Sequence, residues 1–268
     1  MTGKKVSLYL LTGTLLMCTL QLDGWAQRTK SSLSAGEQRK AEKGLKDNKY
    51  FFYFIDSTVS NFGNEDEKKI FKEAIQRDIM ARLLYMKFRF SESYREIRRS
   101  QELLIKVYRS SLKRDLENTM SLLNGFAGLI AGSEAVRPRH YLHLGYRDKK
   151  VAETHMMMAD NYRESLLSMR LYKYVRAIKK AKHGKRYAFL AFIYGSSSIQ
   201  EQFQMKPLTF DRIEEYINRL ADENSKDTYL TIHYDNYYRL HREQSFYDRV
   251  WNDPSLRDLP EYSEYMSD

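Results

Sequence analysis

Breaks in regular structure are scarce in this chain. Four prolines and 12 glycines interrupt 268 residues, of which 30% are charged. Apolar side chains recur at helical spacing through most of the chain, as in Phe71, Ile75, Ile79 and Leu83. Few breakers together with this periodicity favour long amphipathic helices over strands and turns. The sequence therefore predicts an all-α fold, an elongated multi-helix bundle with a weak helical-repeat character.

The first 26 residues have the pattern of a secretory signal peptide. Lys4 and Lys5 precede an apolar stretch at 6–20, and Gly24-Trp25-Ala26 offers small residues at the −3 and −1 positions. This order is typical of a cleaved export signal. Cleavage after Ala26 would remove the only cysteine, Cys18, and leave no disulfide or thiol chemistry in an exported protein.

Two alternatives for the N-terminus remain open. Leu15-Leu16-Met17-Cys18 loosely resembles a lipidation motif, although Met17 stands where a small residue is expected. The apolar stretch 6–20 could instead be an uncleaved membrane anchor, but its 15 residues fall short of the roughly 20 that a spanning helix needs. We expect a cut signal peptide and no stable membrane insertion.

Two helical subdomains are predicted, residues 27–136 and residues 137–268, the second ending in an irregular tail. The boundary lies in a Gly- and Pro-containing stretch, 132–147, which reads as a loop. Asn64 and Thr209 have the residue types preferred at helix N-caps. The expected helices are 36–59, 65–90, 93–112, 115–130, 148–182 (with a bend near Ser168), 210–221 and 228–250. Residues 187–194 form an apolar element of undecided type.

Charge is unevenly distributed along the chain. Residues 137–187 contain 14 basic and 4 acidic side chains, whereas residues 200–268 contain 8 basic and 15 acidic ones. Such polarity suits head-to-tail self-association or docking among charged neighbours, or else the two parts face each other within one fold. The sequence leaves both open.

A basic helix face is the most specific feature of the middle region. At 100° per residue, one arc holds Lys173, Arg176, Lys179 and Lys180. The opposite arc is apolar, with Leu171, Tyr174, Val175, Ile178 and Ala181. We predict that the basic face binds acidic surfaces of filament or envelope proteins, or a second copy of the chain. A merely solvated face, or a site for anionic lipid or cell-wall polymer, is the alternative. Export argues against nucleic acid.

Motifs for catalysis are not found. His140 and His143 have a ligand-like spacing, but neighbouring arginines would repel a metal ion. Oxygen ligands for calcium are offered by Asp222, Glu223, Asn224 and Asp227, without the glycine and terminal glutamate of a calcium loop. There is no Gly-rich phosphate loop and no nucleophile elbow. We predict no enzyme activity, no cofactor and no metal site.

The chain as a whole resembles the flagellar-coiling proteins of spirochaetes. The resemblance rests on the exported, basic, helical character and on two stretches, Glu37–Phe54 and Glu153–Arg186. It implies a helical sheath protein in the periplasm that docks on the flagellar filament and affects its curvature and motility. No functional residue is carried over, because the family has no short motif to match. The rival functions are a periplasmic helical-repeat adaptor of an envelope complex and a cell-wall hydrolase.

Overall fold

The computed structural model describes residues 35–131, 136–197, 208–242 and 244–266, and these contain helices and no strand. This confirms the all-α prediction. The chain begins with a helix over residues 35–62, called here the N-terminal helix. It continues with α2 (Glu65–Met86), α3 (Phe90–Ile130), α4 (Val136–Asn161), α5 (Leu167–Gly195), α7 (Phe210–Leu220), α8 (Glu223–Asn236), α9 (Phe246–Asn252), the 3₁₀ turn η1 (Leu256–Asp258) and α10 (Tyr262–Met266). The predicted signal peptide, Cys18 included, lies outside the described residues.

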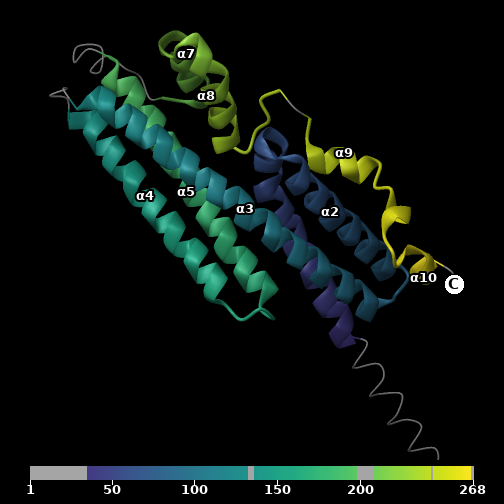
Figure 1. The fold of residues 1–268 in the computed structure, drawn as a ribbon. Coiled ribbons are helices and arrows are strands. Elements are labelled where there is room, and N and C mark those ends of the chain that lie inside the picture. Colours follow the sequence, from purple (N-terminus) through teal and green to yellow (C-terminus); the bar gives the residue numbers. More distant parts are fainter. Residues whose placement is uncertain (1–34, 132–135, 198–207, 243, 267–268) are drawn as a thin grey trace, which may run out of the picture.

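Helix α3 joins the two halves of an elongated bundle (Figure 1). Its 41 residues span about 60 Å at 1.5 Å per residue. The first half packs against α2 and the N-terminal helix, and the second half against the antiparallel pair α4 and α5. Helices α7 and α8 lie at one end, beside α5, while α9 lies along α2.

The largest core lies where these halves meet. It combines aromatic and aliphatic side chains of the N-terminal helix, α2, α3, α5 and α9, among them Phe51, Phe71, Tyr108, Tyr174 and Phe246. A second core fills the α7 and α8 end around Phe126 and Phe189. The main core thus draws on both sides of residue 136, and the division into two subdomains stays a prediction.

Two expected breaks do not occur. Helix α3 runs without interruption across Asp115, which is buried inside it rather than capping a new helix. Helix α4 begins at Val136 and contains most of the expected loop, including Pro138 and Gly145. Pro138 is tolerated because it lies in the first turn, where a backbone N–H has no helical partner. The loop prediction for 136–147 is therefore wrong.

One expected helix is instead a hairpin. The predicted helix 148–182 is divided by a turn at residues 162–166 into α4 and α5, which pack side by side. Gly184 does not end α5, which continues to Gly195 and absorbs the undecided segment 187–194. A Cβ at Gly184 would lie 3.0 Å from Thr119 Cγ2 and 3.3 Å from the Gly145 carbonyl oxygen. Glycine is needed here for close helix approach rather than for a stop.

The C-terminal part also departs from expectation. The predicted helix 228–250 is two helices, because α8 ends at Asn236 and Tyr238 takes a left-handed φ of 58°. Ser245 then caps α9 by accepting a hydrogen bond from the Asp248 backbone N–H. The tail after Trp251 is not irregular throughout, since it forms η1 and α10 and packs on α2 through Leu259 and Tyr265.

Candidate functional site

The four predicted binding residues lie on α5 but point to different neighbours. Arg176 is exposed. Lys173 Nζ lies 3.8 Å from the Met158 sulfur on α4. Lys179 Nζ lies over the Phe54 ring, 3.9 Å from its centroid, on the N-terminal helix. The basic face of α5 is therefore partly packed: some of its side chains contact α4 or the N-terminal helix, and Arg176 is exposed to solvent.

Positive charge on this surface is largely uncompensated around Arg176. Lys180 is an exception, since its Nζ lies 3.2 Å from the buried Asp148 carboxylate of α4. The pKa of His155 is lowered by burial and further by the positive charges of Lys173, Arg176 and Lys180. These three cations therefore lie close enough to His155 of α4 to disfavour its protonation.

Two lysines of the same basic stretch are not on the surface. Lys182 and Lys185 are fully buried and extend from α5 toward Asp235 of α8. Lys182 Nζ lies 2.6 Å from Asp235 Oδ1, and Lys185 Nζ lies 2.8 Å from Asp115 Oδ1 of α3. Ser57 donates a further hydrogen bond to Asp235. We call Lys182, Lys185, Asp115 and Asp235 the buried ion cluster.

The buried ion cluster pairs an acidic residue of the C-terminal part with basic residues of the middle region inside the fold. Asp235 belongs to the acidic C-terminal part and neutralises lysines of the basic middle inside the fold. Burial disfavours the charged form of Asp235, but the two ammonium groups outweigh it and lower the pKa of this carboxyl to about 2. The ion pairs of the cluster connect α5 to α3 and α8. Because all four side chains are buried, the cluster has a structural role inside the fold.

The residues considered as metal ligands are exposed histidines and acidic residues with local structural contacts. His140 and His143 are exposed on α4. Asp222 caps α8 by accepting hydrogen bonds from the backbone N–H groups of Asn224 and Ser225. Asp227 pairs with Arg242 at 2.6 Å. Within the described ranges, no three His, Cys, Asp or Glu side chains are grouped to hold a metal ion. Nor does any described helix have the length and apolarity needed to cross a membrane.

The C-terminal segment is held firmly onto α2 and α3. Glu261 pairs with Arg99 at 2.7 Å and with Arg77 at 3.4 Å. The Tyr265 hydroxyl donates to Glu96 of α3, and Gln76 of α2 donates to the Pro254 carbonyl oxygen at 2.7 Å. These contacts fix the backbone of a segment that has little helix of its own.

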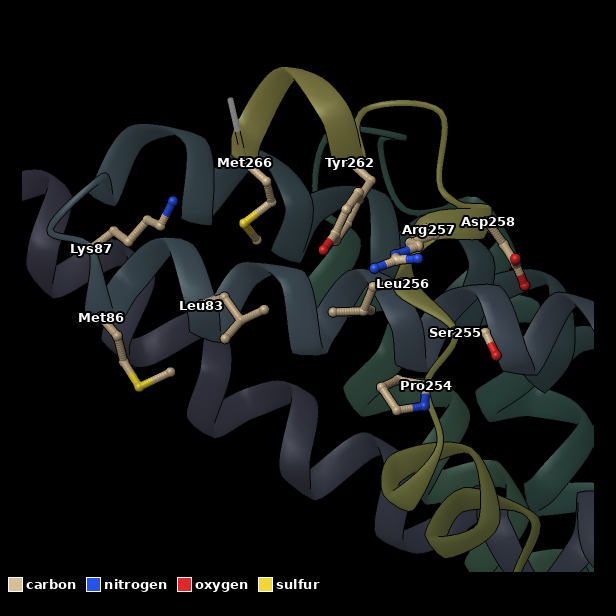
Figure 2. A pocket seen from close by; sticks show the side chains of 10 residues that line it. All are labelled: Leu83, Met86, Lys87, Pro254, Ser255, Leu256, Arg257, Asp258, Tyr262 and Met266. Carbon is tan, nitrogen blue, oxygen red and sulfur yellow. The ribbon is translucent and has the colours of Figure 1, made fainter. Parts of the chain in front are cut away.

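A pocket of about 790 Å³ lies between this segment and the end of α2 (Figure 2). In Figure 2, Tyr262 and Met266 of α10 point toward α2, and Leu83 and Leu256 face the same space. The remaining lining residues are Met86, Lys87, Pro254, Ser255, Arg257 and Asp258. We call this the tail pocket. It is open, mostly apolar, and large enough for several side chains of a partner.

Exposed apolar side chains continue from the tail pocket into the turn between α2 and α3. Met86 is 65% exposed and Phe88 is 80% exposed. Two cations, Lys87 and Arg257, belong to the lining, while the charge of Asp258 is matched by Lys72 at 3.2 Å. The surface therefore combines apolar contact area with positive charge. The sequence did not predict this surface, because Leu83 belongs to the periodic apolar stripe of a core helix and the tail was expected to be irregular.

Comparison with known families gives one finding. A family model described as surface protein adhesin OmpL37 matches residues 35–264, which is nearly all of the described chain. No curated protein and no solved structure matches. The model is one of surface adhesins, not of enzymes and not specifically of flagellar-coiling proteins.

Proposed function

This chain belongs to the family of the surface protein adhesin OmpL37, and from that membership we propose that it is an exported surface protein that binds partner proteins through the tail pocket. The family supports export, a place at the cell envelope and contacts with other proteins. The tail pocket supports the choice of surface, because it joins a concave apolar lining to exposed Met86 and Phe88. The proposed partner is a host or envelope protein.

Composition of the tail pocket suits adhesion to more than one protein. Methionine side chains are flexible and polarizable, so they adapt to differently shaped partners. Met86 at the end of α2 and Met266 of α10 both belong to the lining of the tail pocket. Lys87 and Arg257 favour partner segments in which an acidic residue accompanies apolar ones.

The backbone conformation of Phe88 is a second argument for this binding surface. It has a φ of 60°, in the left-handed region that costs a bulky residue about 1–2 kcal/mol. Its ring is 80% exposed and gains little packing in return. A strained and exposed aromatic residue is better explained by binding than by folding.

We expect Phe88→Gly to weaken partner binding without destabilising the protein. Glycine takes a φ of 60° freely, so the free energy of unfolding should stay unchanged or rise by up to about 1 kcal/mol. Loss of an exposed aromatic contact should weaken binding about tenfold or more. The measurement is binding of the purified exported chain to cultured host cells and to immobilised matrix proteins.

The matched control is Leu129→Ser. Leu129 is 63% exposed near the other end of α3, far from the tail pocket. This variant removes a similar apolar side chain and should bind as the wild type does. If both variants lose binding equally, or if Phe88→Gly binds normally, the surface formed by the tail pocket and the adjoining turn is not the adhesion surface.

A second proposal concerns the basic face and the flagellar filament. The sheath role that affects curvature and motility rests on the resemblance to flagellar-coiling proteins, and a periplasmic location beside the filament goes with it. The adaptor of an envelope complex is its rival. Both would use Lys173, Arg176, Lys179 and Lys180 against an acidic partner or a second copy. Exposed Arg176 and the shared field at His155 support this use.

For this second proposal the sharpest variant is Lys173→Glu with Arg176→Glu. Neither residue has an ion pair among the described residues, so the fold should persist. Co-sedimentation of the variant with isolated filaments should fall severalfold, and wild-type co-sedimentation should fall as salt rises past about 0.15 M. Lys150→Glu, an exposed lysine of α4, is the control. If the variant co-sediments as the wild type does at every salt concentration, the basic face does not bind the filament and is only solvated surface.

A further inference from the structure

A second pocket lies on another side of the bundle, between the N-terminal helix and α9. Its volume is about 290 Å³. The residues that line it are Lys49, Phe52, Tyr53, Asp56, Ser57, Tyr238, Tyr247 and Asp248. We call it the aromatic pocket, because half of its lining is aromatic. It shares no residue with the tail pocket.

The walls of the aromatic pocket are rings in fixed contact. Phe52 and Tyr247 have ring centroids 5.1 Å apart, and Tyr53 stacks on Tyr238 at 6.0 Å. Tyr53 is nevertheless 62% exposed, so much of its ring is available to a ligand. The left-handed φ of 58° at Tyr238 holds its ring against the N-terminal helix. Such walls offer negatively charged ring faces.

Two carboxylates complete the aromatic pocket, and neither has an ion-pair partner among the described residues. Asp56 accepts hydrogen bonds from Ser245 Oγ at 2.9 Å, from Ser60 Oγ at 3.1 Å and from the Tyr247 backbone N–H at 3.1 Å. Burial raises the pKa of Asp56, and the negative charge of Asp248 raises it further. An anion that is desolvated and faces a like charge is stabilised when a cation arrives.

Two lysine ammonium groups of the protein lie over aromatic rings in or beside the aromatic pocket. Lys182 Nζ lies 4.7 Å from the centroid of the Tyr238 ring, on the buried side, and Lys179 Nζ lies 3.9 Å from that of Phe54. The rings of this region are thus placed for ammonium groups. Lys49 is the one basic residue of the lining, and it is exposed, so its flexible side chain can move away from the pocket.

From this geometry we propose that the aromatic pocket binds an organic cation, an ammonium or guanidinium group on a short apolar stem. The stem contacts the Tyr247 ring, which the buried Phe52 ring supports from behind. The charge lies between the Tyr53 ring and the carboxylates of Asp56 and Asp248. Lysine and arginine side chains of a bound protein carry this chemistry, and so does the choline group. The inference does not depend on the tail pocket.

The test uses three small cations with the exported chain: Nα-acetyl-lysine amide, Nα-acetyl-arginine amide and choline. Trp251 stacks on Tyr247 with centroids 5.6 Å apart, so its fluorescence reports occupancy. We expect saturable binding of about millimolar affinity, as suits a ligand of this size. Nα-acetyl-norleucine amide, which has the stem without the charge, should bind at least about tenfold more weakly. Whichever cation binds most tightly identifies the source of the group.

Two variants assign the binding to this pocket. Asp248→Asn and Tyr53→Ala alter exposed side chains and should leave the fold intact, while each weakens the cation about threefold to tenfold. Asp253→Asn, an exposed carboxylate outside the pocket lining, is the matched control and should bind as the wild type does. The proposal fails if no cation saturates the fluorescence change, if the norleucine probe binds equally well, or if both pocket variants bind normally.

Discussion

Replacing Asp235 by alanine is expected to lower the free energy of unfolding by about 3–5 kcal/mol. The change removes the carboxylate that holds Lys182 at 2.6 Å and leaves this ammonium buried without a counter-charge. Lys185 loses one of its two partners but keeps Asp115 at 2.8 Å. The hydroxyls of Ser57 and Thr58 lose their acceptor as well. Denaturant unfolding followed by circular dichroism measures the loss.

Two further variants show whether the loss comes from a stranded charge. Lys182→Met combined with Asp235→Asn removes both charges and keeps an acceptor oxygen near Ser57, so much of the lost stability should return. Asp227→Ala breaks an exposed pair with Arg242 and should cost less than about 1 kcal/mol. A cost for Asp235→Ala no greater than that of Asp227→Ala would contradict a structural role for the buried ion cluster.

The same carboxylate gives the wild type a sensitivity to acid. Its pKa is about 2 in the folded protein and 3.8 ordinarily, because the lysine ammonium groups outweigh the effect of burial. The folded state therefore binds this proton less readily than the unfolded state does. About 2 kcal/mol of stability is present above pH 3.8 and is lost as the pH falls toward 2. The Lys182→Met, Asp235→Asn variant should lose correspondingly less over this range.

Phe71→Ala is expected to cost about 3–5 kcal/mol, the second large effect. Phe71 is fully buried, and its ring lies between Phe52 of the N-terminal helix and Phe246 of α9, with centroid distances of 5.7 and 6.1 Å. Truncation would leave a cavity at the point where three helices meet. Thermal and denaturant unfolding both measure the change.

Ile79→Ala is the control from the same helix. Ile79 is only partly buried, at the edge of the main core, although it shares the apolar stripe of α2 with Phe71. It should cost clearly less than Phe71→Ala, below about 2 kcal/mol, since part of its surface is already in water. Equal costs for the two would mean that the stripe, rather than the three-helix junction, determines stability.

Local rules decided the fold class and the starts of α2 and α7. Few breakers and helical spacing predicted an all-α chain, and the described residues are helical with no strand. Asn64 caps α2 by accepting a hydrogen bond from the Glu67 backbone N–H at 2.8 Å. Thr209 stands at the N-cap position of α7, although its side chain makes no capping hydrogen bond there. A cap acts through bonds within one turn of its own residue, so sequence alone identifies it.

Helix ends were less predictable. Asp115 and Gly184 read as a start and a stop, yet both lie inside long helices because partners from elsewhere in the chain explain them. Asp115 meets Lys185, and Gly184 lies against Gly145 and Thr119. The turn at 162–166, which makes a hairpin of one expected helix, has no proline or glycine to announce it.

What the sequence determined by itself is the helical class, the overall basic charge and the amphipathic character of α5. At 100° per residue, Lys182 and Lys185 fall on the apolar arc of α5, so periodicity alone directs these two lysines inward. Tertiary structure decided which carboxylates pair with these lysines, since Asp235 stands 50 or more residues away along the chain and Asp115 lies on α3. The tail pocket was decided in the same way, since α10 meets α2 only in the folded chain. Periodicity shows that a residue faces a neighbour, but the pairing of a buried charge or an opening for a partner depends on which distant segment that neighbour is.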